Sequence, residues 1–266
     1  MSAKNPAKAL VIAGNEATGG AGIQVDLKTF HQLGVYGMGA ITCIVSFDPN
    51  NNWAHRFVPI DPQVIKDQVE AGTSTWDVDT VKIGMLGTVS TIDAVAQALA
   101  TQSWKNVVLD PVLICKGQEA GDAHDTDEAL KRTILPLATV VTPNLFESAA
   151  LAGMEIHDEA DLAKAAEKIG ALGPRYVLAK GGMQLPGDEA VDLLWDGAKI
   201  TRYATEKIGK ERPTGAGCTL AAAITAELAK GASVYDAVTT AKELVTRGIQ
   251  GRLSAHTPFD AVWQQA

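Results

Sequence analysis

Short apolar runs alternate with amphipathic segments along almost the whole chain. A bounded apolar run is typical of a buried parallel strand, whereas apolar residues three and four positions apart are typical of a helix that covers a sheet. The pattern predicts strands at 9–13, 39–45, 81–83, 107–109, 138–141 and 176–179, a hairpin at 190–203, and helices that end near 34, 70, 100, 135, 171, 229 and 248. This alternation predicts an α/β fold: a mostly parallel central sheet with helices on both faces plus a small hairpin, in a single domain over 1–266.

The turn that opens the helix ending at 229 combines flexible backbone with a thiol. Gly215 and Gly217 let the chain curl around Ala216, so that several unpaired N–H groups at the start of the helix point outward together. Such a cup binds anions, although small residues here also permit close packing of helices. Cys218 falls in the first turn, where the positive potential of a helix N-terminus lowers the pKa of a thiol. We therefore expect an accessible thiolate beside a candidate anion site.

A glycine-rich turn follows the first predicted strand. Its glycines match neither Gly-x-x-x-x-Gly-Lys-Ser/Thr nor Gly-x-Gly-x-x-Gly, so neither nucleotide-binding fingerprint is present. The turn still allows a flat ligand to approach the backbone closely, with Glu16 and Asp26 as hydrogen-bond acceptors. Spacing alone favours the simpler interpretation, which is a tight turn with two solvated acids.

Two further strands deliver polar residues to the carboxyl edge of the sheet, where open parallel sheets bind their ligands. Asp110 follows the strand at 107–109 and is either a metal or phosphate-network acid or a turn-forming Asp-Pro. Asn144 follows the strand at 138–141 and caps the next helix, with Glu147 at its third position, which is also how a plain capping box looks. The stretch 116–125 lacks an apolar period, so we expect a mobile lid there.

Composition narrows the classes of function. The 266 residues are 46% hydrophobic and 20% charged, with a net charge of −8. This charge argues against nucleic acid or an anionic membrane as a partner, so an anionic ligand such as a small-molecule phosphate needs a local positive site.

The apolar run at 9–13 is too short for a signal peptide or a membrane span, and we expect a cytoplasmic protein. A reducing cytosol leaves Cys43, Cys115 and Cys218 as thiols, with Cys43 a small core residue.

Six sequence blocks in register resemble the vitamin-kinase branch of the ribokinase superfamily across nearly the whole chain. The blocks are AG at 13–14 with GGAGIQ at 19–24, DLKTF at 26–30, KIGM at 82–85, DPV at 110–112, TPNLFE at 142–147 and GAGCT at 215–219. This branch includes hydroxymethylpyrimidine phosphate kinases and a group of pyridoxal kinases. It carries a cysteine where most of the superfamily has an aspartate as general base, and Cys218 matches that cysteine.

Two positions resemble the dual-cysteine pyridoxal kinases. Phe47 stands where hydroxymethylpyrimidine kinases typically carry glutamine, and Cys115 lies in the lid, where they lack a cysteine. The resemblance implies ATP-dependent phosphorylation of pyridoxal, with pyridoxine and pyridoxamine, at the 5′-hydroxyl. It further implies that the Cys115 thiolate adds reversibly to the aldehyde and that Cys218 assists deprotonation of the hydroxyl. The alternatives are a hydroxymethylpyrimidine kinase of thiamine biosynthesis and a non-catalytic vitamin or nucleotide sensor.

The same resemblance implies a role for each site residue. The catalytic residues it implies are Cys218, Cys115, Gly215, Ala216 and Gly217. The ring pocket is expected to be lined by Gly14, Glu16, Ala21, Asp26, Phe47, Met85 and Val112. ATP is expected to be bound by Asn144, Glu147, Lys180, Gly181 and Lys242, and Mg²⁺ by Asp110 and Glu147. The family suggests a homodimer and leaves a monovalent cation open. Segments 15–18 and 211–214 depart from the family pattern, which bears on substrate preference and turnover.

Overall fold

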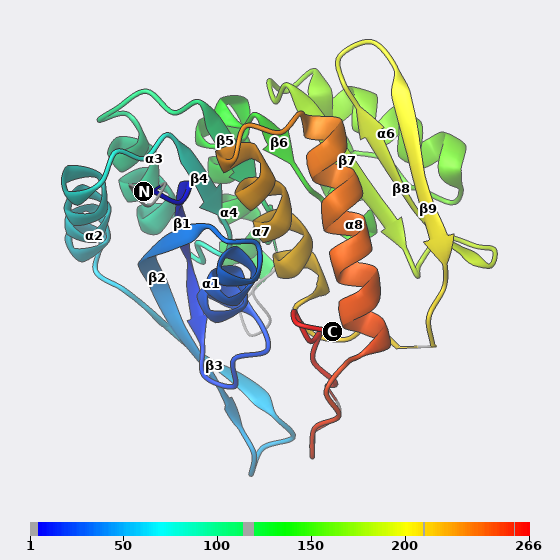
Figure 1. Cartoon of the computed structure of the whole chain (residues 1–266), viewed down its shortest axis with the longest axis horizontal. Coiled ribbons are helices and arrows are strands. Elements are labelled where there is room, and N and C mark those ends of the chain that lie inside the picture. The colour runs from blue at the N-terminus through cyan, green and yellow to red at the C-terminus, as the bar shows by residue number, and fades with distance from the viewer. Residues whose placement is uncertain (1–4, 114–119, 210, 258) are drawn as a thin grey trace.

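The structure is a computed structural model that describes residues 5–113, 120–209, 211–257 and 259–266. A nine-stranded sheet forms its centre, in the order β3-β2-β1-β4-β5-β6-β7-β8-β9 (Figure 1). The strands are β1 (Lys8–Glu16), β2 (Tyr36–Asp48), β3 (Ala54–Pro59), β4 (Thr80–Ile83), β5 (Asn106–Leu109), β6 (Val140–Val141), β7 (Tyr176–Gly182), β8 (Glu189–Trp195) and β9 (Ile200–Glu206). The six strands from β2 through β1 and β4 to β7 run parallel, and β3, β8 and β9 add antiparallel pairs at the two edges.

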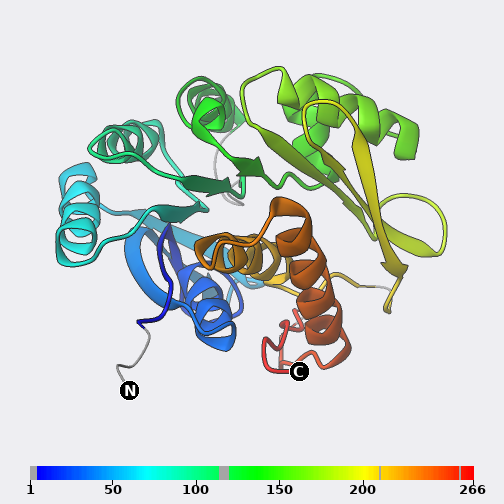
Figure 2. The ribbon, with the colours of Figure 1, turned by 45° about the horizontal axis from the view of Figure 1, so that its top comes forward.

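Helices cover both faces of the sheet, as the sequence predicts (Figure 2). One face carries α1 (Gly22–Gln32), α7 (Ala216–Ala229) and α8 (Val234–Gln250). The other carries α2 (Pro62–Thr75), α3 (Val89–Leu99), α4 (Ala120–Thr133), α5 (Leu145–Ala152) and α6 (Glu159–Gly170), with a short 3-10 helix η1 (Leu135–Leu137). Successive strand residues point to opposite faces, so Val108 packs with α7 and α8 while Leu109 packs on the other side.

The structure adds two details to the sequence-based prediction. The strand expected at 39–45 extends through Asp48, because Ser46 and Phe47 pair with Arg56 and His55 of β3; the stretch after it is therefore a hairpin. Within the stretch 116–125, where a mobile lid was expected, the residues from Ala120 onward belong to α4, and the lid itself stays a prediction. Residues 114–119 lie outside the described part of the chain. No helix among the described residues is long and apolar enough to cross a membrane.

Candidate active site

The N-terminus of α7 packs against the turn between β1 and α1, backbone against backbone. Gly215 is the N-cap of α7 and has a φ of 87°, a conformation that favours glycine. A Cβ atom placed on Gly215 would lie 2.3 Å from the carbonyl oxygen of Gly20. A Cβ atom on Gly22, whose φ is 66°, would lie 2.3 Å from the carbonyl oxygen of Gly14. Both positions therefore require glycine, and the cup and the glycine-rich turn form one site.

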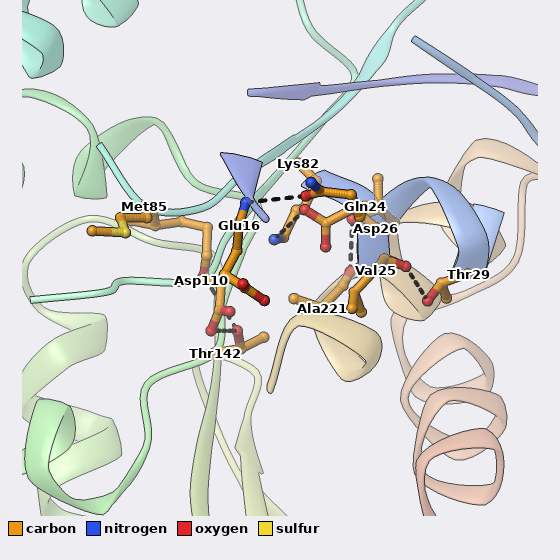
Figure 3. A network of polar contacts seen from close by, with 12 residues as sticks. Glu16, Gln24, Val25, Asp26, Thr29, Lys82, Met85, Asp110, Thr142 and Ala221 are labelled. Atoms are coloured by element: carbon orange, nitrogen blue, oxygen red, sulfur yellow. Dashed lines mark hydrogen bonds and ion pairs between the residues drawn. The ribbon is translucent and has the colours of Figure 1, made fainter. Parts of the chain in front are cut away.

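The cup faces a carboxylate and an ammonium group at the ends of β5 and β7. Asp110 Oδ1 accepts hydrogen bonds from Lys180 Nζ at 3.1 Å and from Thr142 Oγ1 at 3.1 Å; Figure 3 shows the contact with Thr142. A Cβ atom placed on Gly217 would lie 3.5 Å from Lys180 Nζ and 3.8 Å from Asp110 Oδ2. Three expected site residues from distant parts of the sequence thus meet at the carboxyl edge of the sheet.

Asp110 and Lys180 form a buried ion pair. Burial by itself raises the pKa of Asp110, but the ammonium groups of Lys180 and Lys82 outweigh burial and hold that pKa below its usual range. Burial likewise disfavours the charge on Lys180, whose pKa the carboxylates of Asp110 and Glu147 raise above its ordinary value. Both groups are therefore charged at neutral pH.

Asn144 and Glu147 form a complete capping box at the start of α5. Asn144 Oδ1 accepts from the backbone N–H of Glu147 at 3.0 Å, and Glu147 Oε2 accepts from the backbone N–H of Asn144 at 2.8 Å. Glu147 is 7% exposed, and burial raises its pKa to about 7 even though Lys180 acts in the opposite direction. The capping interpretation is confirmed, while a further role toward a metal stays a prediction.

A cavity of about 480 Å³ lies beside the cup. It brings together most of the residues expected to bind ATP, with Glu147 outside its lining. The predicted residues in the lining are Asn144, Lys180, Gly181, Gly215, Ala216, Gly217 and Lys242. The sequence reasoning missed Asp192 of β8, which lines the same cavity and binds Lys242 Nζ through Oδ2 at 2.6 Å. It missed Asp192 because nothing in a hairpin strand marks an acid whose partner is 50 residues away.

A second buried ion pair joins α1 to β4 (Figure 3). Lys82 Nζ lies 2.8 Å from Asp26 Oδ2, and both side chains are at most 1% exposed. Asp26 Oδ1 has no hydrogen-bond partner among the described residues. Burial raises the pKa of Asp26 to about 6, with Lys82 opposing, so the carboxylate is ionised at neutral pH. The expectation of a solvated acid at Asp26 is therefore wrong, and Lys82 is a site residue that its place in an apolar strand did not reveal.

Two of the residues expected in the ring pocket meet beside Cys43. A Cβ atom placed on Gly14 would lie 2.6 Å from Cys43 Sγ and 3.6 Å from Met85 Sδ. Cys43 is fully buried, which confirms it as a core residue. Ala21 is the N-cap of α1, and the backbone N–H of Val112 donates to the carbonyl of Asp110 at 2.9 Å. Their contact with a substrate stays a prediction.

Glu16 and Phe47 have protein partners that the sequence did not indicate. The carboxylate of Glu16 is buried and accepts from Thr18 N at 2.6 Å, Thr18 Oγ1 at 2.7 Å and Gly20 N at 3.1 Å, so it stabilises its own turn. The ring of Phe47 lies 4.7 Å from that of His55 and lines a separate cavity of about 250 Å³. Among the described residues, no contact joins the side chain of Glu16 or of Phe47 to Met85.

The environment of Cys218 contradicts one expectation. Cys218 lies in the first turn of α7, as predicted, but burial raises the pKa of its thiol to about 11. Lys82 and the backbone N–H of Gly22 act in the opposite direction without overcoming burial. The expectation of an accessible thiolate near neutrality is therefore wrong. The second expected cysteine, Cys115, lies outside the described residues.

Proteins similar to this chain are small-molecule kinases. Pyridoxine kinase of Bacillus subtilis is 48% identical over 244 residues, which is 91% of this chain and 90% of that protein. A hydroxymethylpyrimidine/phosphomethylpyrimidine kinase from the same organism is 36% identical over 254 residues, covering 94% and 93%. The pyridoxine kinase of Bacillus subtilis is therefore nearer in sequence to this chain than the second kinase of the same organism.

Solved structures of pyridoxal kinases share the fold. An ADP complex of Bacillus subtilis pyridoxal kinase has a TM-score of 0.94 at 45% identity and covers 98% of both chains. Staphylococcus aureus pyridoxal kinase with AMP-PCP and pyridoxal has a TM-score of 0.91 at 37% identity and covers 99% of this chain and 95% of that one. The expected ribokinase-like fold is confirmed. Residues 16–262 match the model of phosphomethylpyrimidine kinase, and the chain belongs to that family of kinases.

Proposed function

We propose that the chain transfers the terminal phosphoryl group of ATP to the 5′-hydroxyl of pyridoxal, giving pyridoxal 5′-phosphate. The observation that carries the proposal is the cup at Gly215–Gly217, which opens into the 480 Å³ cavity beside the Asp110–Lys180 pair. The fit of a nucleotide is supported by the relatives that bind ADP and AMP-PCP. Pyridoxine and pyridoxamine are the further substrates that we propose.

Each part of the site has a role in this reaction. The oxygen of the 5′-hydroxyl forms a bond to the terminal phosphorus while the bond to the bridging oxygen breaks and ADP leaves. The backbone N–H groups of Gly215, Ala216 and Gly217 stabilise the charge on the transferred group, and Lys180 supports them from β7. Phosphoryl transfer needs mainly positioning, so Cys218 acts as a neutral thiol that orients the hydroxyl. The hydroxyl proton passes late in the reaction to an oxygen of the transferred phosphoryl group and from there to water.

Asp110 and Glu147 fit a magnesium site. Mg²⁺ prefers carboxylate oxygens and commonly takes one or two from the protein, with water and phosphate oxygens completing its shell. Asp110 Oδ1 is held by Lys180 and Thr142, whereas its Oδ2 faces Gly217 of the cup. A cation close to the buried carboxyl of Glu147 stabilises the ionised form of that carboxyl. Bound Mg²⁺ neutralises phosphate charge, and the change Glu147→Gln is expected to raise the Mg²⁺ concentration needed for half-maximal rate.

A substrate panel tests the proposed reaction. ATP consumption is measured with pyridoxal, pyridoxine, pyridoxamine and hydroxymethylpyrimidine in the presence of Mg²⁺. We expect pyridoxal to be preferred. A tenfold preference for the pyrimidine would instead identify the thiamine-pathway kinase. Binding of pyridoxal without turnover of any vitamer would identify a non-catalytic sensor.

Cys115 is proposed to tether the aldehyde. Its thiolate forms a carbon–sulfur bond to the carbonyl carbon, and the carbonyl oxygen takes up a proton, so the adduct is a reversible hemithioacetal. The change Cys115→Ala is therefore expected to lower the rate with pyridoxal more than the rate with pyridoxine, which has no aldehyde. Equal losses with the two vitamers contradict the tether.

We further propose a homodimer formed through the β2–β3 hairpin. Ile44 and Val58 pair across these strands and are 37% and 59% exposed, and β3 is an edge strand. Sedimentation of the wild type and of Val58→Lys tests the dimer: a monomeric wild type or an undisturbed variant refutes this interface. A requirement for a monovalent cation and a cytoplasmic location stay predictions.

A further inference from the structure

The C-terminal segment, residues 253–257 and 259–266, returns to the start of α7 and contacts the chain on both sides of the cup. Figures 1 and 2 show this segment, in red, beside the ends of α7 and α8. It folds back on itself through the pair Leu253 and Ala261, whose backbone groups exchange hydrogen bonds of 2.8 and 3.0 Å. The backbone N–H of Trp263 donates to the carbonyl of Gly248 at the end of α8. The segment is thus anchored to a helix that packs along α7.

Thr214 is bound to this segment through both of its backbone groups. Its N–H donates to the carbonyl of Asp260 at 2.7 Å, and its carbonyl accepts from the N–H of Val262 at 3.0 Å. Thr214 directly precedes Gly215, so these two bonds fix the entry to the cup. A Cβ atom on Gly20 would lie 3.3 Å from the methyl group of Thr214, which shows how closely this junction is packed.

Gln264 holds the other side of the cup. Its Nε2 donates to Thr219 Oγ1 at 3.1 Å, and the two side chains are 3% and 0% exposed. Thr219 follows Cys218, and its backbone N–H donates to the carbonyl of Gly215 at 2.8 Å, which closes the first turn of α7. The cup amides have no partners within the helix, so their direction depends on what holds the residues before and after them.

We propose that Gln264 is a positioning residue for phosphoryl transfer, which keeps the cup amides aimed through its hydrogen bond to Thr219. This inference rests on the proposed role of the cup. Donors that stabilise a transition state act through their prior orientation, and small displacements are costly to the rate. The loss of Gln264 is therefore expected to lower kcat and to change the KM for ATP little, because the cup engages the group in flight more than the ground-state nucleotide.

The neighbouring glutamine provides a matched control. Gln265 is exposed, whereas Gln264 is buried. We expect Gln264→Leu to lower kcat about tenfold with a change in KM of less than about threefold, and Gln265→Leu to stay within about twofold of wild type. Thr219→Val is expected to show the loss of kcat seen in Gln264→Leu, and Thr219→Ser, which keeps the hydroxyl, to retain the wild-type rate. Thermal unfolding of each variant identifies losses caused by unfolding.

A double variant completes the test. If the hydrogen bond is the cause, Thr219→Val combined with Gln264→Leu has a kcat no lower than the poorer single variant, because both remove the same bond. Independent, multiplying losses, or a wild-type kcat in Gln264→Leu, overturn the inference. Cys218→Ala, measured in parallel, separates this failure from a failure of the proposed function: if Cys218→Ala also keeps full activity, the reaction does not occur at this cup.

Discussion

The buried carboxyl of Glu147 makes the stability of the protein depend on pH, and a substitution can remove this dependence. Burial raises its pKa from an ordinary value of 4.5 to about 7, so the folded protein holds this proton more tightly than the unfolded chain does. Between these two values the folded state binds more protons, and stability falls as the pH rises. Below about 4.5 the group costs nothing, and above about 7 its cost is constant.

The magnitude follows from the same rise. At 1.36 kcal/mol for each pKa unit, the change from 4.5 to about 7 corresponds to about 3 kcal/mol of destabilisation at pH 8 relative to a neutral side chain. Glu147→Gln removes the charge and keeps an acceptor for the backbone N–H of Asn144, so the cap survives. The free energy of unfolding of the variant minus that of wild type is therefore expected to be about 3 kcal/mol larger at pH 8 than at pH 4.5.

Urea unfolding at both pH values, without nucleotide or Mg²⁺, measures this difference. Glu167→Gln is the control, because Glu167 is exposed on α6 and has no buried charge to relieve. A stability difference between wild type and Glu147→Gln that does not change with pH refutes the reasoning. Adding Mg²⁺ should not increase the stability advantage of Glu147→Gln over wild type, because a cation bound to wild type favours the ionised carboxylate and stabilises the wild type. An increase would also refute the reasoning.

Three further results are expected. Urea unfolding of Lys82→Met should show a loss of about 3–5 kcal/mol, with much of it restored in Lys82→Met/Asp26→Asn, because the single change strands a buried carboxylate. Gly22→Ala should lower the free energy of unfolding by about 3 kcal/mol, and Gly153→Ala by less, because both have positive φ but only Gly22 meets a backbone carbonyl. Alkylation of Cys218 by iodoacetamide, followed by peptide mass spectrometry, should keep accelerating up to about pH 11, and a plateau by pH 8 would contradict its raised pKa.

Local patterns predicted most of the fold because strands, caps and turns depend on residues near one another. Asn144 caps α5 with Glu147 at its third position, as the order of these residues after a strand indicates. The glycines at 215 and 217 likewise marked the cup from spacing alone. Strand ends also placed Asp110 correctly, because the carboxyl edge of a parallel sheet gathers whatever follows each strand.

Long-range burial was not predictable in this way. Lys82 and Asp26 are 56 residues apart, and neither sequence neighbourhood shows that the other supplies its partner. The pKa of Cys218 was predicted from its helix end, whereas the structure adds burial, which has the opposite sign and the larger effect. Gln264 was missed because its partner Thr219 lies 45 residues away, on the first turn of α7.

The lysines of the cavity do not supply the free positive charge that an anionic ligand needs. Lys180 is paired with Asp110, and Lys242 with Asp192, so the two ammonium groups are neutralised before any ligand arrives. In a chain of net charge −8, the attraction for a nucleotide must therefore come from the cup amides, from a metal that accompanies the nucleotide, or from a cation whose partner is neutral.

Arg212 is such a cation. It lines the cavity, its Nη1 donates to the neutral amide of Gln184 at 3.0 Å, and no acid among the described residues forms an ion pair with it. Arg212→Gln is therefore expected to weaken ADP binding about threefold at low ionic strength in calorimetry without Mg²⁺, and the difference should vanish in high salt because Arg212 is exposed. Arg202→Gln is the control, since Arg202 is paired with Glu159 and Glu189. If Arg212→Gln binds ADP as wild type does at low salt, the attraction resides in the backbone of the cup, and its amides bind the nucleotide already in the ground state.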